Sequence, residues 1–382
     1  MAASIIRIEA VTRPRELREF VLFPFRLYRS DPHWVPPLIS DRLKHFNPAH
    51  NPFFEHAEAQ LFRAVRDGQT VGTIAAVADE THLQIWGEPV GFFGAFEVIE
   101  EYEVAAALFD AARRWLAARG REVIRGPMDL NINDECGLLV EGFDGPPVIM
   151  MMYNPPYYQA FLERYGFAKA KDLYAYRVDV ASYGPNLENL PERVKRVARI
   201  AQERYHVQMR HIDMKQFDRE AELIKPIYRQ AWARNWGAIP MTDAEFSYLA
   251  ANLKQIVDPE LTYLAFLDGQ PVGCFLGLPD FCQVAMHLHG WLFPFGWINY
   301  LRYKSKIDGL RVVIMGVLEE HRLKGIESLF YQEGCRVAVR KGYKWAEMSW
   351  ILEDNFKIIR GIEGMGGVKY RTYRLYDIPT HA

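Results

Sequence analysis

Residues 311–333 read RVVIMGVLEEHRLKGIESLFYQE, an apolar strand that leads into a short loop and then into helical sequence. A helix that begins after a glycine turn presents unpaired backbone N–H groups, and its dipole favours an anion there. Arg322 and Lys324 add positive charge beside these amides. We therefore expect a phosphate-binding loop that consists of Arg322, Leu323, Lys324, Gly325 and Ile326.

The hairpin that precedes this stretch occurs twice in the chain. Residues 61–79 read LFRAVRDGQTVGTIAAVAD and residues 263–280 read YLAFLDGQPVGCFLGLPD, each a strand, an Asp-Gly turn and a second strand. The two Asp-Gly turns lie 201 residues apart, and Asn154 is matched by Asn355 at the same spacing. Several matches at one spacing indicate that the chain arose by duplication.

Both copies follow one order of strands and helices. The matching expected elements are the opening strands 5–11 and 207–213, the helices 14–28 and 217–236, the strands 90–98 and 310–318, the helices 105–116 and 325–341, and the strands 122–125 and 344–350. This order predicts an α/β protein of two tandem domains, each a mixed, mostly antiparallel sheet flanked by helices. We place copy one at 1–180, a linker with a helix at 181–206, and copy two at 207–382.

The composition argues against a nucleic-acid-binding, a secreted or a membrane-spanning protein. The chain has 382 residues with 46 Lys or Arg and 48 Asp or Glu, and a formal charge of −2 gives no general attraction to nucleic acid. Four cysteines without a CxxC pair indicate free thiols in a reducing compartment. The start does not resemble a signal peptide, and no apolar window reaches about 18 residues. We expect a cytoplasmic protein and leave its oligomeric state open.

The loop at 322–327 resembles the pyrophosphate loop of the GNAT acyltransferase superfamily, R/Q-x-x-G-x-G/A, although Glu327 stands where the family has Gly or Ala. The resemblance covers nearly the whole chain and implies two GNAT-like domains, an acyl-CoA co-substrate and no metal. By this resemblance the cofactor contacts are Val317, Leu318, Arg322, Leu323, Lys324, Gly325, Ile326 and Asn355. We expect Gly325→Val to abolish cofactor binding and to leave the fold intact.

Acyl transfer to an amine is helped by a group that takes a proton from the amine. Glu319 and Glu320 are the candidates by position, and the alternative is that both are surface charges beside the loop. His287 and His289 alternate in VAMHLH, so a strand would place them on one face. We consider His287 a candidate base and His289 a candidate acceptor contact, against the alternative of ordinary polar-face histidines.

The corresponding loop of copy one, residues 99–104, contains three carboxylates and no glycine. Like charge repels a pyrophosphate, so we expect copy one not to bind coenzyme A in the usual way. It would instead support copy two or supply residues of the acceptor site. Asp134 and Glu135, in an insertion at 131–147, are candidates for binding an acceptor ammonium, and a purely structural loop is the alternative.

Copy two has its own insertion at 291–306, which reads WLFPFGWINYLRYKSK. Aromatic residues beside Lys and Arg are typical of a helix at the level of lipid headgroups, so we expect peripheral membrane contact here. The same residues could line a channel for an acyl chain or pack over the sheet. Trp297 is a candidate substrate contact.

Three stretches carry a finer resemblance. NDECGLLVEGFD (133–144), YNPPYY (153–158) and LFPFGW (292–297) resemble a bacterial subgroup of tandem GNAT-like proteins associated with lipid-linked N-acylation, including bacterial ceramide synthases. The resemblance implies an N-acyltransferase that moves a long acyl chain to a sphingoid-type amine. The alternatives are an acetyltransferase for a small polar or protein amine, and a non-catalytic protein that binds acyl-CoA or lipid.

Overall fold

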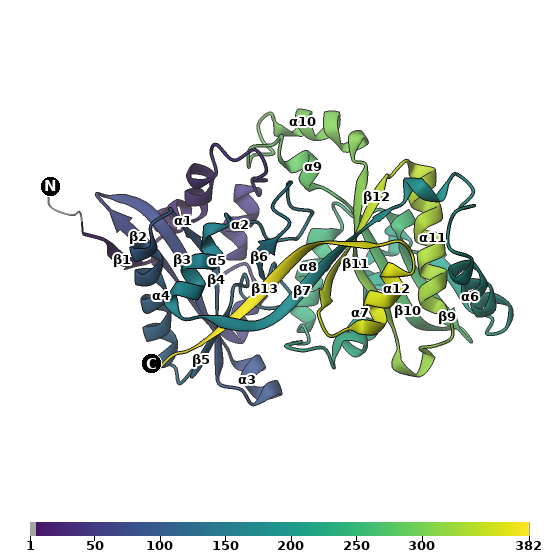
Figure 1. Ribbon diagram of the computed structural model, residues 1–382, viewed down its shortest axis with the longest axis horizontal. Coiled ribbons are helices and arrows are strands. Elements are labelled where there is room, and N and C mark those ends of the chain that lie inside the picture. The colour runs from purple at the N-terminus through teal and green to yellow at the C-terminus, as the bar shows by residue number, and fades with distance from the viewer. Residues whose placement is uncertain (1–4, 382) are drawn as a thin grey trace. The chain divides into compact units, whose positions relative to one another are not determined.

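The computed structural model describes residues 5–381 and divides into two compact units. Unit 1 takes the chain up to Leu173, the segment Ala285–Tyr300 and the end of the chain from Arg371. Unit 2 takes Tyr174–Val284 and Leu301–Tyr370. Each unit is a mixed sheet with helices against it (Figure 1), so the predicted α/β class is confirmed.

Unit 1 is built around a sheet whose only parallel neighbours, among the strand pairs of the described chain in this unit, are β4 and β5. In pairing order its strands are β1 (Arg7–Ala10), β2 (Ala57–Arg66), β3 (Gln69–Asp79), β4 (Val90–Val98), β5 (Val123–Gly126) and β13 (Val368–Pro379), with β6 (Leu138–Glu141) also on β13. Its helices are α1 (Pro14–Leu27), α2 (Ile39–His45), α3 (Glu80–Trp86), α4 (Tyr102–Ala117) and α5 (Tyr157–Tyr165). Leu108 and Phe109 of α4 pack on Phe93 in the core of this unit.

Unit 2 repeats the plan. Its strands in pairing order are β8 (Gln208–His211), β9 (Thr262–Leu267), β10 (Gln270–Pro279), β11 (Gly309–Val317), β12 (Trp345–Leu352) and β7 (Ala168–Asp179). Its helices are α6 (Glu192–Glu203), α7 (Phe217–Trp232), α8 (Asp243–Leu253), α11 (Ile326–Lys341) and α12 (Phe356–Glu363). The segment Ala285–Tyr300 of unit 1 begins at the last residue of α9 (Cys282–Ala285) and includes the first part of α10 (Gly296–Tyr303). Phe330 of α11 packs on Tyr263 and Phe275, which fastens the helix to the sheet.

The two predicted hairpins are confirmed in nearly the same conformation. Asp67 and Gly68 have φ angles of 50° and 76°, and Asp268 and Gly269 have 50° and 77°. Two consecutive left-handed residues suit the twist of a two-residue hairpin, and Asp-Gly tolerates them. The agreement of the dihedral angles in the two turns fits the duplication read from the sequence.

In unit 2 the parallel strands β11 and β12 pair from Gly309↔Trp345 to Val312↔Met348. Both strands continue beyond the last pair, β11 to Val317 and β12 to Leu352. The strands therefore part just before the chain enters the loop that leads to α11.

The compact units depart from the linear boundaries at 180 and 207. Unit 2 begins at Tyr174, inside β7, and unit 1 resumes at Arg371, inside β13, which copy two contributes. Both boundaries therefore fall within a long strand and not in a linker. The helices α2, α3, α8 and α9 had no counterpart in the sequence analysis.

Candidate functional site

The N-terminus of α11 is open to an anion. Gly325 is the N-cap residue, in the left-handed conformation, and no side chain caps the helix. Within the described range 5–381, the backbone N–H groups of residues 324–327 donate no hydrogen bond. The first turn of a helix leaves such groups without partners, and they attract negative charge. We call these four amides the anion cradle.

Two features of the backbone require a glycine at position 325. Its φ angle is 83°, and a Cβ atom would lie 2.7 Å from the carbonyl oxygen of Val197 in α6. Figure 1 shows α6 alongside α11. The expectation that Gly325→Val leaves the fold intact is therefore wrong, because any L side chain here is strained and collides with the α6 backbone.

The charged side chains of the loop hold it in place. Arg322 places Nη2 3.4 Å from the carbonyl oxygen of Ala231 and Nε 3.4 Å from that of Val317, which ties the loop to α7 and β11. Lys324 Nζ lies 3.0 Å from His321 Nδ1. Leu323 has a φ angle of 70° and an exposed side chain. Lys324 directly precedes the N-cap residue Gly325.

The end of β11 supplies less than the resemblance implies. The amide of Leu318 donates to the carbonyl oxygen of Val272 at 2.9 Å, so it is not free to polarise a thioester. Glu319 pairs with Arg234 at 2.7 Å on the surface, and Glu320 is also exposed. Nothing in the described chain removes water from either carboxylate, which favours the surface-charge alternative for both.

The matched asparagines have structural partners. Asn355 caps α12, because its Oδ1 accepts the amide of Ile358 at 3.4 Å. Asn154 is buried, with Oδ1 accepting the amide of Leu139 at 2.7 Å. The contact of Asn355 with a cofactor stays a prediction.

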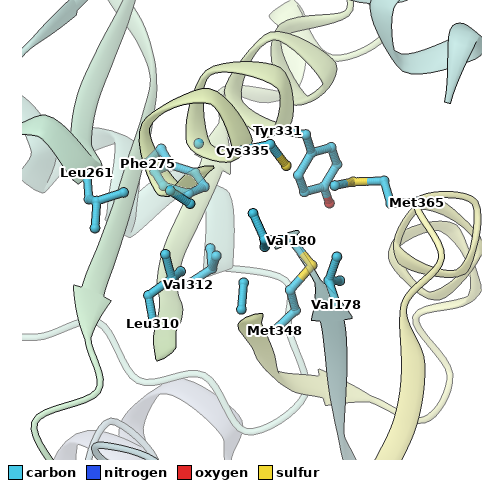
Figure 2. A pocket seen from close by; sticks show the side chains of 13 residues that line it. Val178, Val180, Leu261, Phe275, Leu310, Val312, Tyr331, Cys335, Met348 and Met365 are labelled. Carbon is cyan, nitrogen blue, oxygen red and sulfur yellow. The ribbon is translucent and has the colours of Figure 1, made fainter. Parts of the chain in front are cut away.

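Unit 2 contains an apolar cavity between α11 and the sheet (Figure 2). It encloses about 30 Å³, room for roughly two water molecules. Its lining consists of Val178, Val180, Leu261, Phe275, Leu310, Val312, Tyr331, Gly334, Cys335, Ala338, Ala346, Met348 and Met365. None of these residues comes from 291–306, and the space is too small for a long acyl chain.

In unit 1, the N-terminus of α4 corresponds to the N-terminus of α11, and residues of the same unit contact both this helix end and the preceding strand β4. Glu101, the N-cap residue of α4, forms two hydrogen bonds with Arg66 at 2.6 and 2.8 Å. Beyond the pairing of β4 with β5, the amide of Met128 donates to the carbonyl oxygen of Phe93 at 2.8 Å. A Cβ atom on Gly94 would lie 1.9 Å from the carbonyl oxygen of Met128. The chain after β5 therefore lies directly against β4.

Near the end of β4, a carboxylate is held between two tyrosines. The hydroxyls of Tyr28 and Tyr158 donate to Oε2 of Glu97 at 2.6 and 2.8 Å, and the amide of Val98 donates to the Tyr158 oxygen at 2.7 Å. Oε1 of Glu97 has no hydrogen-bond partner among residues 5–381. Burial raises the pKa of Glu97 to about 7, although both hydroxyls oppose the shift. We call Glu97 with its two tyrosines the Glu97 clamp.

The sequence analysis missed Glu97. The signal was present, because Glu97 is the only charged residue in the strand VGFFGAFEV at 90–98. A lone charge in an apolar strand points to a buried, functional or paired group. Ala95 has a φ angle of 44° at an irregularity in the pairing of β4 with β3. Such a kink re-aims the side chains that follow it.

The structure places the predicted Asp134 and Glu135 beside a buried ion pair. Asp129 lies 2.6 Å from Arg42, and its amide donates to the carbonyl oxygen of Glu135 at 2.8 Å. Burial opposes the charge of Asp129, but Arg42 keeps its pKa below the usual range. Burial, with Asp129 nearby, raises the pKa of Asp134 well above its usual range. Burial and Arg42 lower the pKa of His45 to about 4.

His287 and His289 do not lie on a strand, so that prediction is wrong. Both residues follow α9 in a series of turns. His289 has a φ angle of 51° and Gly290 one of 81°, which ends any alternation of faces. The two histidines lie within the segment that belongs to unit 1, whereas the anion cradle belongs to unit 2.

Residues 291–298, which we call the aromatic segment, expose apolar side chains. The exposed residues are Trp291, Phe293, Phe295, Trp297 and Ile298, of which Phe293 is 71% and Phe295 74% exposed. The segment is anchored at Gly290, whose carbonyl oxygen accepts the amide of Ile39 at 3.0 Å. This exposure argues against the alternative that the insertion packs over the sheet.

Residues 5–381 contain neither a membrane-spanning helix nor a cluster of metal ligands. No helix between residues 5 and 381 combines the length and apolar character needed to cross a bilayer. In the same range, no three His, Cys, Asp or Glu side chains come together as a metal site.

Two curated proteins are similar to this chain over nearly its whole length. The bacterial ceramide synthase of Caulobacter vibrioides is 38% identical over 375 residues, which cover 96% of each chain. Protein YghO of Escherichia coli is 37% identical over 372 residues, which cover 95% of this chain and 92% of YghO. No protein-family model matches the sequence.

Solved structures share the fold at low sequence identity. A tandem GNAT protein from the clavulanic acid biosynthesis pathway aligns with a TM-score of 0.60 at 13% identity, covering 99% of both chains. A GCN5-related N-acetyltransferase from Sphaerobacter thermophilus aligns with a TM-score of 0.53 at 15% identity, covering 99% of this chain and 96% of its own. These alignments confirm two tandem GNAT domains as the fold of this chain.

Proposed function

This chain belongs to the acyltransferase family that includes the bacterial ceramide synthase of Caulobacter vibrioides, and we propose that it moves a long acyl group from an acyl-CoA to a long-chain primary amine. Acyl transfer is the general activity of the family and of the fold. The proposal concerns the two substrates and the residues that hold them. The sphingoid class of acceptor is suggested by the name of the relative.

The observation that carries the proposal is the anion cradle. Four amides without partners lie at the N-terminus of α11, directly after the place where β11 and β12 part. A diphosphate placed there receives several N–H donors and the favourable end of the helix dipole. Lys324 adds a cation beside the N-cap residue. The parting of the two strands leaves their backbones available to the pantetheine arm.

The aromatic segment supports a long-chain acceptor. Its exposed rings are followed along the chain by three exposed cations, Arg302, Lys304 and Lys306. Apolar rings with adjacent cations suit the boundary between lipid headgroups and acyl chains. We propose that this segment makes peripheral contact with a membrane, where a long-chain amine resides. A small polar amine in water requires no such surface.

Mass spectrometry of the products tests the proposal. The purified protein is incubated with sphinganine and either palmitoyl-CoA or acetyl-CoA, and the same donors are offered to a short polar amine. We expect the N-palmitoyl amide of sphinganine as the main product. A product formed only from acetyl-CoA and the short amine, or no release of coenzyme A at all, would contradict the proposal.

A double variant of the aromatic segment tests whether this segment contacts the membrane. Phe293→Ser with Phe295→Ser removes two rings that the structure leaves exposed, so the fold is not expected to change. We expect turnover to fall with sphinganine in vesicles that contain anionic lipid and to persist with sphinganine dispersed in detergent. Equal loss in both assays would count against a membrane role for the segment.

A further inference from the structure

We infer that unit 1 binds the amine acceptor, with its ammonium group at Glu97 and its hydrocarbon chain along the aromatic side chains that lead toward the aromatic segment. The inference rests on the proposed function, because it assigns the acceptor of that reaction to a site. It concerns residues of unit 1 alone.

Glu97 is oriented to receive a donor. The Tyr28 and Tyr158 hydroxyls both occupy Oε2, so the carboxylate is fixed while Oε1 keeps its hydrogen-bonding capacity. Tyr158 is itself fixed by the amide of Val98. A primary ammonium has three N–H donors and forms strong, charge-assisted hydrogen bonds with a carboxylate. Glu97 is partly rather than fully buried.

Glu97 has no ion-pair partner within 4.0 Å in the described chain. Arg42 lowers the pKa of Glu97 only from a distance, because it forms its ion pair with Asp129, and no other Lys, Arg or His of residues 5–381 pairs with Glu97. A desolvated carboxylate without a counter-ion is unfavourable, which is why the pKa of Glu97 rises. A bound ammonium would supply the missing charge.

A line of aromatic rings connects Glu97 with the anchor of the aromatic segment. The ring centroids of Tyr28 and Trp34 are 5.2 Å apart, and those of Trp34 and Phe25 are 5.0 Å apart. A Cβ atom on Gly290 would lie 2.5 Å from Cε1 of Phe25, so Gly290 lies directly against that ring. The polar end and the apolar end of the line match an amphipathic amine.

The carboxylate is specific to copy one. Val98 pairs with Gly72 and Val317 pairs with Gly273, so the residue that corresponds to Glu97 in copy two is Gly316. Copy two has the anion cradle and copy one has the Glu97 clamp. The duplicated fold thus carries two different charged sites, one suited to an anion and one to a cation.

Binding of an amine in the absence of any acyl donor tests the inference. Dodecylamine is titrated into the wild type, Glu97→Gln and the control Glu100→Gln, which removes an exposed carboxylate three residues away. Hydrogen bonds to charged groups predict affinity at least about tenfold weaker for Glu97→Gln. We expect little change for Glu100→Gln, and no effect of either substitution on dodecanol. Unchanged dodecylamine affinity in Glu97→Gln, or equal weakening in both variants, would overturn the inference.

The path of the hydrocarbon chain has its own test. Trp34→Ala removes a ring from the middle of the aromatic line. Loss of apolar contact should weaken dodecylamine more than butylamine, because the short amine does not extend past Tyr28. Equal weakening of both amines would overturn this placement of the chain.

The pH dependence of the wild type keeps the inference testable if Glu97→Gln does not fold. Amine binding should strengthen between pH 5.5 and 8 as the carboxyl group loses its proton near pH 7. The titratable and charged groups around Glu97 are Tyr28 at the C-cap of α1, Arg42 and His45 on α2, Asp129 and Asp134 after β5, and Tyr157 and Tyr158 on α5. Asp134→Asn should retain the rise. A flat profile, or a rise lost in Asp134→Asn, would overturn the inference.

These measurements are separate from the test of the donor site. If dodecylamine binds through Glu97 but no acyl-CoA binds at the anion cradle, the proposed function fails and the amine site stands. If amides form while Glu97→Gln binds dodecylamine normally, the amine site fails and the proposed function stands.

Discussion

The helices α4 and α11 follow the fourth strands of the two copies, and each is 16 residues long. At α11, Gly325 bends the backbone and leaves the first amides without partners. At α4, Glu101 occupies the N-cap position and pairs with Arg66. One backbone plan therefore gives an anion site or a closed helix end, depending on a few loop residues. The strand before each helix also differs, because β4 has Glu97 where β11 has Gly316.

Gly325→Val is the substitution that we expect to have the largest effect on the difference between α11 and α4. The left-handed conformation and the close approach of α6 should together lower the free energy of unfolding by roughly 2–4 kcal/mol. Gly342→Val is the matched control, because Gly342 ends the same helix at a φ angle of 83° with open space around it. Urea denaturation should show a smaller loss for the control. Equal losses would mean that contact with α6 does not matter.

Lys324→Glu reverses the charge at the anion cradle. We expect the affinity for coenzyme A to fall by about 30–150-fold, the effect of roughly 2–3 kcal/mol on a charged hydrogen-bonded group. Lys215→Glu, on the exposed surface of unit 2, is the control for a general change of charge. Calorimetric titration measures both variants. A loss of similar size in Lys215→Glu would point to a non-specific attraction instead.

Glu327 separates the contribution of an amide from that of a carboxylate. Glu327→Ala removes negative charge beside the anion cradle and should tighten coenzyme A binding about twofold to fivefold. Glu327→Pro also removes one amide donor and should bind about tenfold more weakly than Glu327→Ala. Proline is tolerated in the first turn of a helix. If the two variants bind equally, the amide of residue 327 does not face the ligand.

The smallest effect is expected at the closed end of α4. Hydrogen bonding to Arg66 lowers the pKa of Glu101, so the pair stabilises the fold above the ordinary carboxyl pKa and the gain is lost as pH falls through the lowered value. Because both side chains are partly exposed, Glu101→Gln should cost only about 0.2–1 kcal/mol at pH 7. Glu103→Gln, which removes a weaker surface pair, is the control. A pH-independent difference between the two would contradict this account.

Several features were readable from the sequence because they depend on neighbouring residues. The Asp-Gly hairpins and the start of α11 at Gly325 each follow from a few adjacent side chains. The strand expected around His287 failed because alternation over six residues is weak evidence against two consecutive left-handed residues. Gly325→Val was misjudged because the sequence does not show that α6 lies against this glycine.

The sequence alone determined the duplication, the order of strands and helices, and the glycine loop that begins α11, because these are set by local periodicity and turn chemistry. The tertiary structure decided which carboxylate is buried between two tyrosine hydroxyls with no ion pair to it in the described chain. Tyr28 and Tyr158 stand 69 and 61 positions from Glu97 in the chain. Burial and hydrogen bonding between such distant segments arise only when the chain folds, and they turn one charged residue of an apolar strand into a candidate binding site.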